Sequence, residues 1–182
     1  MRFEDVLDNG KLWAVIYEGK NVDVLTETLS QWFDTDYLRA FFNQNLNDLE
    51  KYFHITNVDK AIFDTVSDAA SLACVIMDVN PAANLDALFR PLENYRMSEM
   101  VLSKEKAKGN RISGHDSWLR LYAIKLDDGI FLITGGAIKL THTMKERQHT
   151  LEELLRVELV RNYLIENGVI DANGLKELID TI

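Results

Sequence analysis

The sequence predicts an α+β fold in which several helices pack against a small antiparallel sheet. Two apolar, strand-like runs at residues 119–126 and 130–140 are joined by Asp127-Asp128-Gly129. Asp-Gly between such runs is a strong hairpin signal, because glycine tolerates the positive φ that tight turns need. Apolar residues recur at helical spacing both before and after this hairpin. A strand, several helices, a hairpin and further helices, in that order, indicate helices packed on one face of the sheet.

The first strand is predicted at residues 12–17, which read LWAVIY. This run is short, aromatic and β-branched, and the turn-forming pairs Asn9-Gly10 and Glu18-Gly19 bound it on either side. We expect this strand to join the same sheet as the hairpin.

Two helices follow the first strand. Apolar side chains recur at helical spacing over residues 22–33, and a second helical pattern covers residues 38–53. Asp34 or Asp36 is suitably placed to cap the second helix, because a carboxylate at that position accepts hydrogen bonds from free backbone N–H groups.

A third helix is predicted to open at Asn57 or Asp59 and to end before the Asn-Pro pair at residues 80–81. A short helix at residues 85–89 stops at Pro91. Residues 104–115, KEKAKGNRISGH, are polar and basic and contain two glycines. This composition is typical of an exposed loop.

The C-terminal part of the chain is predicted to be helical. Its apolar stripe is broad enough to bury against the sheet, so we expect Leu155→Asp to unfold the protein. Asn167-Gly168 ends this helix in the manner of a C-cap, and residues 175–179 form a short closing helix. The stripe consists of Leu151, Leu154, Leu155, Val157, Leu159, Val160 and Leu164.

The length of 182 residues predicts a single domain, residues 1–182, with an α+β core at 1–149 and a packed helical extension at 150–182. No apolar run approaches the roughly 20 residues that span a bilayer, and the N-terminus, MRFEDVLDNG, lacks a signal-peptide core. We therefore expect a cytoplasmic protein. Cys74 is the one cysteine, which excludes a disulfide framework, and we expect its thiol to be buried.

Charge is distributed unevenly along the chain. With 20 Lys and Arg against 29 Asp and Glu, the protein is acidic overall. Residues 104–149 nevertheless carry 9 basic and 5 acidic side chains, a net charge of +4, whereas residues 1–103 and 150–182 have net charges of −9 and −4. Such asymmetry is an argument about binding partners, and it directs attention to this basic segment.

Familiar cofactor motifs are absent from the sequence. The glycines at 109 and 114 have the spacing of a phosphate-binding loop, but no Lys-Ser or Lys-Thr follows them. Residues 171–174 resemble the start of a calcium loop without its later ligands. His142 and His149 lie seven residues apart with no carboxylate at ligand spacing. We expect neither a metal nor another cofactor.

The basic segment has the residue types that metal-free RNA cleavage requires. Such cleavage needs a base for the 2′-hydroxyl, an acid for the leaving oxygen and cations for the phosphorane. Histidine suits the first two roles because its pKa lies near neutrality, and Arg and Lys suit the third. The alternative is a solvated sheet edge whose basic side chains discourage aggregation. The residues concerned are Lys104, Lys106, Lys108, Arg111, His115, Arg120, Lys139, His142, Lys145, Arg147 and His149.

Residues 118–146 resemble the C-terminal sheet of the RelE/ParE toxin superfamily, and are most similar to its HigB-like and phage-derived members. Leu119-Arg120-Leu121-Tyr122 is similar to the first strand of that sheet. Gly135-Gly136 and the run from Lys139 to Thr143 are similar to the end of the second, and residues 89–92 resemble the phrase that precedes the sheet. The resemblance implies a β-α-α-β-β core with extra helices. It covers about 60 residues, and this chain is longer and more acidic than the family's usual members.

This resemblance implies a toxin-like protein of a toxin–antitoxin or prophage module, acting as a metal-independent mRNA endonuclease on the ribosome and partnered by an antitoxin. Arg120 and Lys139 would clamp phosphate, with Arg111 assisting, and His142 or His115 would carry protons. The other RNA-binding residues would be Lys104, Lys106, Lys108, Lys145 and Arg147. A shared fold does not fix function. The alternatives are a catalytically silent protein-binding module of the same fold and a gyrase-inhibiting toxin, which needs no proton carrier.

Overall fold

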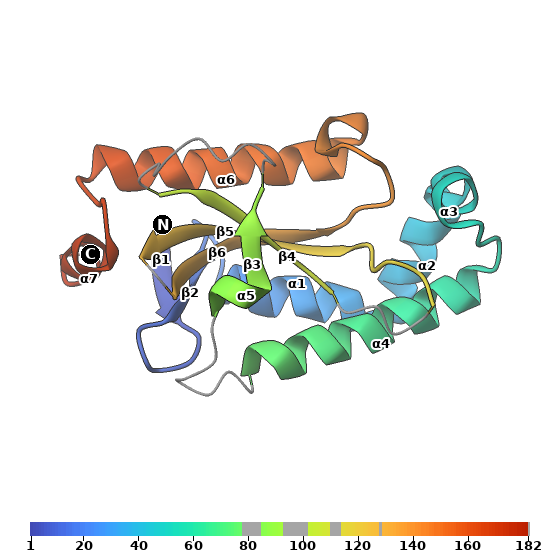
Figure 1. Ribbon diagram of the computed structural model, residues 1–182, viewed down its shortest axis with the longest axis horizontal. Coiled ribbons are helices and arrows are strands. Elements are labelled where there is room, and N and C mark those ends of the chain that lie inside the picture. Colours follow the sequence, from blue (N-terminus) through green and yellow to red (C-terminus); the bar gives the residue numbers. More distant parts are fainter. Residues whose placement is uncertain (78–84, 93–101, 110–113, 128, 182) are drawn as a thin grey trace.

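A computed structural model describes residues 1–77, 85–92, 102–109, 114–127 and 129–181. These residues form a six-stranded sheet in the order β1-β2-β6-β5-β4-β3, together with seven α-helices. Helix α6 lies along one face of the sheet, and α1 and α4 lie on the other side (Figure 1). Both chain termini lie at the same end of the molecule. The predicted α+β class is confirmed, and the detail of a RelE-like core stays a prediction.

The predicted hairpin is confirmed. Strands β5 (Leu119–Asp127) and β6 (Ile130–Ile138) are antiparallel neighbours. Strand β2 (Leu12–Ile16) joins the same sheet as expected, but it runs parallel to β6. The sheet is therefore mixed, and the prediction of a purely antiparallel sheet was wrong. The four helices α1–α4 and the β3–β4 region intervene between β2 and β6, and a connection of this length permits parallel pairing.

Three further strands were not predicted. They are β1 (Arg2–Asp5), β3 (Phe89–Pro91) and β4 (Lys104–Lys108). The prediction of an exposed loop at 104–115 was therefore wrong for its first five residues. In β4 the side chains of Glu105 and Ala107 are buried and the lysines alternate with them. A strand with lysine at every second position has no continuous apolar run, and its pairing with β5 decides its conformation.

Helices α1 (Val24–Phe33), α2 (Thr35–Gln44), α3 (Leu46–Phe53) and α4 (Val58–Met77) follow β2. The side chain of Asp34 caps α2 by accepting from two backbone N–H groups, as predicted. The predicted second helix is interrupted at Asn45, where α2 ends and α3 begins. Cys74, in the last turns of α4, is exposed, so the expectation of a buried thiol was wrong.

Helix α5 (Leu85–Leu88) precedes β3, and the short 3-10 helix η1 (Met144–Glu146) leads into α6 (Gln148–Glu166). Helix α6 buries Val157, Val160 and Leu164, but Leu155 and Leu159 are 59% and 55% exposed. The expectation that Leu155→Asp would unfold the protein therefore loses its physical basis, because the apolar stripe is wider than the contact with the sheet. Helix α7 (Ala172–Ile179) closes the chain.

The Gly135-Gly136 pair in β6 allows helices to approach the sheet closely from both sides. A Cβ atom at Gly135 would lie 1.8 Å from Oε2 of Glu153 in α6, and one at Gly136 would lie 2.6 Å from Cγ2 of Thr28 in α1. Real Cβ atoms essentially never approach other atoms so closely. The two glycines thus set how near α6 and α1 lie to the centre of the sheet. Within the described part of the chain, every helix is too short or too polar to cross a membrane.

Candidate anion-binding site

A pocket of about 950 Å³ opens on the side of the sheet that α6 covers. Strands β4 and β5 contribute its floor, and the segment between β6 and α6 contributes one wall. Strand β3 and Leu154 of α6 border it elsewhere. We call it the cationic pocket because of the polar side chains that line it: Arg90, Lys106, Lys108, Asp116, Ser117, Arg120, Tyr122, Lys139, His142, Thr143 and Lys145.

Strand register explains why so many cations share this pocket. Lys106 pairs with Tyr122 and Lys108 with Arg120 across the β4–β5 ladder, and Arg90 of β3 pairs with Lys106. Paired residues of antiparallel neighbours point to the same face, and so do residues two apart on one strand. One face of three adjacent strands therefore presents four basic side chains.

Arg120 is held by the backbone that precedes it. Its Nη1 atom donates to the carbonyl oxygens of Ser117 and Leu119, each at 2.7 Å. Burial lowers the pKa of the Arg120 guanidinium, although it stays charged at any ordinary pH. The strand thus orients the guanidinium without neutralising its charge.

Lys139 and Lys106 are half-buried beside this guanidinium. Nζ of Lys139 donates to the carbonyl oxygens of Thr141 and His142, each at 2.6 Å. Nζ of Lys106 donates to the Leu92 carbonyl at 3.0 Å. Burial lowers the pKa of both ammonium groups, and so does the positive charge of Arg120. Lys106 lowers the pKa of Lys139 further.

These three side chains therefore repel one another within one pocket. Among the described lining residues Asp116 is the one acid, and its carboxylate is engaged with Lys108 at 2.9 Å. A bound anion would relieve the repulsion, because each cation would gain an opposite charge in a partly desolvated site. The arrangement suits the binding of an anion.

Tyr122 borders the pocket and carries a buried hydroxyl that is not used as a hydrogen-bond donor to any described residue. The residue is fully buried, and within the described part of the chain its hydroxyl has no hydrogen-bond partner. Burial raises the pKa of Tyr122, so the phenol stays protonated and able to donate. Buried polar groups without partners are uncommon in native proteins, and they often mark a role in binding or catalysis.

His142 is the predicted proton carrier that the structure places in the cationic pocket. Its imidazole is exposed at the rim, where the ring packs edge-on against Tyr52 of α3 with 4.8 Å between centroids. Its carbonyl is fixed by Lys139. An exposed imidazole at the rim of this pocket has the chemistry to accept or donate a proton.

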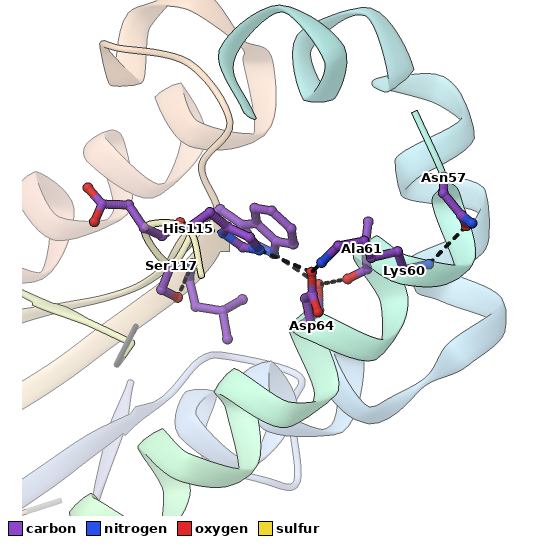
Figure 2. A network of polar contacts seen from close by, with 10 residues as sticks. Asn57, Lys60, Ala61, Asp64, His115 and Ser117 are labelled. Carbon is purple, nitrogen blue, oxygen red and sulfur yellow. Dashed lines mark hydrogen bonds and ion pairs between the residues drawn. The ribbon is translucent and has the colours of Figure 1, made fainter. Parts of the chain in front are cut away.

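His115, the other predicted proton carrier, faces α4 instead of the pocket. Its Nε2 lies 3.1 Å from Oδ2 of Asp64, and its ring stacks on Trp118 with 4.4 Å between centroids (Figure 2). Its Nδ1 lies 2.9 Å from the Asp116 carbonyl oxygen. With both ring nitrogens engaged, His115 joins α4 to the segment that leads into β5.

Other predicted RNA-binding residues have partners of their own. Lys104 pairs with Glu158 of α6 at 3.0 Å, and Arg147 holds both carboxylate oxygens of Asp48 at 2.6 Å. Lys145 is exposed and lines the cationic pocket. Arg111 lies outside the described residues. The structure thus gathers Arg120, Lys139, His142, Lys106, Lys108 and Lys145, and it places Lys104, Arg147 and His115 elsewhere.

Arg90 and Tyr122 line the pocket but were not among the predicted site residues. Tyr122 could have been found from strand alternation, because it follows Arg120 by two residues. Arg90 could not, because its strand was not predicted.

Glu153 is an acid of α6 that is buried against β6 at Gly135, close to this site. Its Oε1 accepts from Arg156 at 2.6 Å, and its Oε2 has no partner among the described residues. Burial raises the pKa of Glu153 to about 7, although Arg156 opposes the shift. Glu153 also contributes to raising the pKa of Tyr122, which places the two groups within electrostatic reach.

The described residues contain no cluster of three or more His, Cys, Asp or Glu side chains that could hold a metal ion. Comparisons of the chain with protein-family models, with curated proteins and with solved structures find no match.

Proposed function

We propose that this protein is a toxin-like RNA endonuclease that binds a phosphodiester in the cationic pocket and cleaves it without a metal ion. The observation that supports this proposal is the convergence of Lys106, Arg120 and Lys139 on one pocket, with the positive charge of Arg120 helping to lower the pKa of both lysines. Phosphate is the anion that RNA offers, and a planar guanidinium binds its oxygens two at a time.

The proposed cleavage uses His142 at the rim of the pocket together with Arg120 and Lys139. His142 takes the proton of the 2′-hydroxyl, and that oxygen forms a bond to phosphorus. The bond between phosphorus and the 5′-oxygen breaks, and the leaving oxygen takes a proton from water at the open rim. Arg120 and Lys139 stabilise the negative charge that develops on the phosphorane. The products are a 2′,3′-cyclic phosphate and a 5′-hydroxyl.

In the cell, this activity would belong to a toxin–antitoxin or prophage module, with mRNA on the ribosome as substrate and an antitoxin as protein partner. The basic surface of β3–β5 suits a target rich in phosphate.

The experiment that tests this proposal measures cleavage of mRNA by the purified protein, with and without ribosomes, and maps the ends of the products. We expect 2′,3′-cyclic phosphate ends, which metal-assisted hydrolysis does not leave. Arg120→Ala, Lys139→Ala and His142→Ala should each abolish cleavage. Lys20→Ala is the matched control, because Lys20 pairs with Glu27 near the opposite edge of the sheet. A wild-type protein that cuts no RNA under either condition would refute the proposal.

The second candidate function is non-enzymatic protein binding through α6. Leu155 and Leu159 are one helical turn apart and are 59% and 55% exposed. Adjacent exposed leucines are typical of a helix that binds another protein. This candidate predicts that the protein cleaves no RNA and that Leu155→Asp loses a protein partner.

A gyrase-inhibiting toxin needs no proton carrier, so its His142→Ala variant would still arrest growth.

A further inference from the structure

An aromatic side chain from α3 stands beside the rim of the cationic pocket. The ring of Tyr52 lies 4.8 Å from that of His142, at an interplanar angle of 78°. His142 lines the pocket, so only the His142 ring separates Tyr52 from the place where we propose that phosphate binds. Nζ of Lys51 lies over the Tyr52 ring, 4.8 Å from its centroid. An aromatic ring and a further cation therefore lie next to the cationic pocket.

Three contacts fix this ring relative to the pocket. Arg147, in the segment that carries His142, holds Asp48 of α3 by two hydrogen bonds of 2.6 Å. The Tyr52 hydroxyl lies 3.4 Å from Oε2 of Glu146. Glu146 is itself held by the backbone N–H of Thr143 at 2.6 Å, which lowers the pKa of its carboxyl. These contacts hold α3 against the segment between β6 and α6, which forms one wall of the pocket.

Proteins that bind single-stranded nucleic acid commonly place a partly exposed aromatic ring beside a phosphate site. The unpaired bases stack on aromatic rings while cations follow the backbone. A base inside a duplex is already stacked on both faces and cannot reach such a ring. An exposed aromatic ring can therefore distinguish unpaired bases from paired ones, whereas cations that contact only the phosphates cannot.

We propose that Tyr52 binds an unpaired nucleobase of the same strand whose phosphate occupies the cationic pocket. This inference rests on the proposed function and specifies its substrate as single-stranded nucleic acid. Base stacking requires Lys51 to leave the ring face, where its Nζ now lies 4.8 Å from the centroid.

The experiment compares three kinds of ligand by fluorescence anisotropy or competition. They are a single-stranded oligonucleotide, in a non-cleavable 2′-O-methyl RNA form and in a DNA form, a blunt-ended duplex with the same number of phosphates, and inorganic tripolyphosphate. The variants are Tyr52→Ala and Tyr52→Phe. Phe63→Ala is the matched control, because Phe63 is an exposed aromatic residue on α4.

We expect Tyr52→Ala to weaken binding of both single strands by about tenfold, because the stacking of a base on an aromatic ring would be lost. Tripolyphosphate and the duplex should bind Tyr52→Ala and the wild type alike, and Tyr52→Phe should bind the single strands nearly as the wild type does. Phe63→Ala should change nothing.

Equal losses for all ligands, or no loss for the single strands, would overturn the role of Tyr52. A wild-type protein that binds none of the three ligands would instead refute the proposed function, so the two failures are distinguishable. Circular dichroism of each variant confirms that it is folded.

Discussion

Asp48 and Arg147 form a two-point ion pair that joins α3 to the segment before α6. Each carboxylate oxygen of Asp48 accepts from a different guanidinium nitrogen at 2.6 Å. The Asp48 side chain is buried, whereas that of Arg147 is half exposed. Removal of the arginine therefore leaves a buried carboxylate without its partner, which is the costly way to break such a pair.

Arg147→Ala should accordingly lower the midpoint of thermal unfolding, because Asp48 would lose its counter-charge. Lys145→Ala, two residues away and exposed, should leave that midpoint unchanged. Differential scanning calorimetry of both variants checks this. If Arg147→Ala also left the midpoint unchanged, the ion pair with Asp48 would not stabilise the fold, and Arg147 would be free to bind a partner, as the sequence had suggested.

The salt dependence of RNA binding should depend on which lysine is removed. The triple replacement of Lys104, Lys106 and Lys108 by alanine should flatten the dependence of affinity on salt. Most of this effect should come from Lys106, which lines the cationic pocket, and little from Lys104, which pairs with Glu158. Lys106→Ala should reduce the slope of log affinity against log salt by about 0.7–0.9, the value for one phosphate contact. The same reduction in Lys104→Ala would show that the ion pair with Glu158 does not keep this lysine from RNA.

Stability should fall as the pH rises toward neutrality because of Glu153. Its pKa is about 7 in the folded protein, above the ordinary value of 4.5 for glutamate. Between these two values the unfolded chain has released the proton that the folded protein still holds, so raising the pH favours unfolding. The loss is complete above about pH 7 and amounts to about 3 kcal/mol at most.

Glu153→Gln should remove this slope and make the protein more stable than the wild type at about pH 8. Urea unfolding at a series of pH values measures the effect. An unchanged slope in Glu153→Gln would assign the pH dependence to another group.

His115 and His142 should respond differently to substitution. His115→Gln should keep RNA cleavage and lose some stability, because the imidazole stacks on Trp118 and contacts Asp64 without lining the pocket. His142→Ala should lose cleavage and stay equally stable, because its ring is exposed. Cleavage rates and unfolding curves for both variants provide the comparison. A His115→Gln variant that is inactive yet fully stable would restore His115 as a proton carrier.

Leu155→Asp should fold normally, since the Leu155 side chain is mostly in water. The change in the free energy of unfolding should stay within about 0.5 kcal/mol, as is usual for surface positions. Val157→Asp is the matched contrast, because Val157 is fully buried and an aspartate there would be an unpaired buried charge. Circular dichroism should show a folded Leu155→Asp protein and an unfolded Val157→Asp protein.

Local patterns in the sequence predict those parts of the fold and site that depend on neighbouring residues. The Asp-Gly turn predicts the hairpin, and the capping role of Asp34 follows from its position before α2. Arg120, Lys139 and His142 lie on or just after that hairpin, so local patterns pointed to them, and the structure gathers them in one pocket.

Partners that lie far along the chain could not be foreseen. The sequence pointed to Arg147 as an RNA-binding residue but did not show its ion pair with Asp48, 99 positions earlier. It pointed to His115 as a proton carrier but did not show its contact with Asp64, 51 positions earlier. The lysine-rich β4 was missed for the same reason, since only its pairing with β5 makes it a strand.

The parallel pairing of β2 with β6 has a consequence for how the chain folds. Ala14 lies beside Ile133, so more than a hundred residues must be synthesised before the centre of the sheet can close. The β1–β2 hairpin and helices α1–α4 precede β6 in the chain and emerge from the ribosome first. Closing so long a loop is entropically costly and slow. During synthesis, the backbone edge of β2 that pairs with β6 therefore stays unpaired until the last third of the protein arrives. A chaperone or a partner protein that covers this edge would raise the yield of folded molecules.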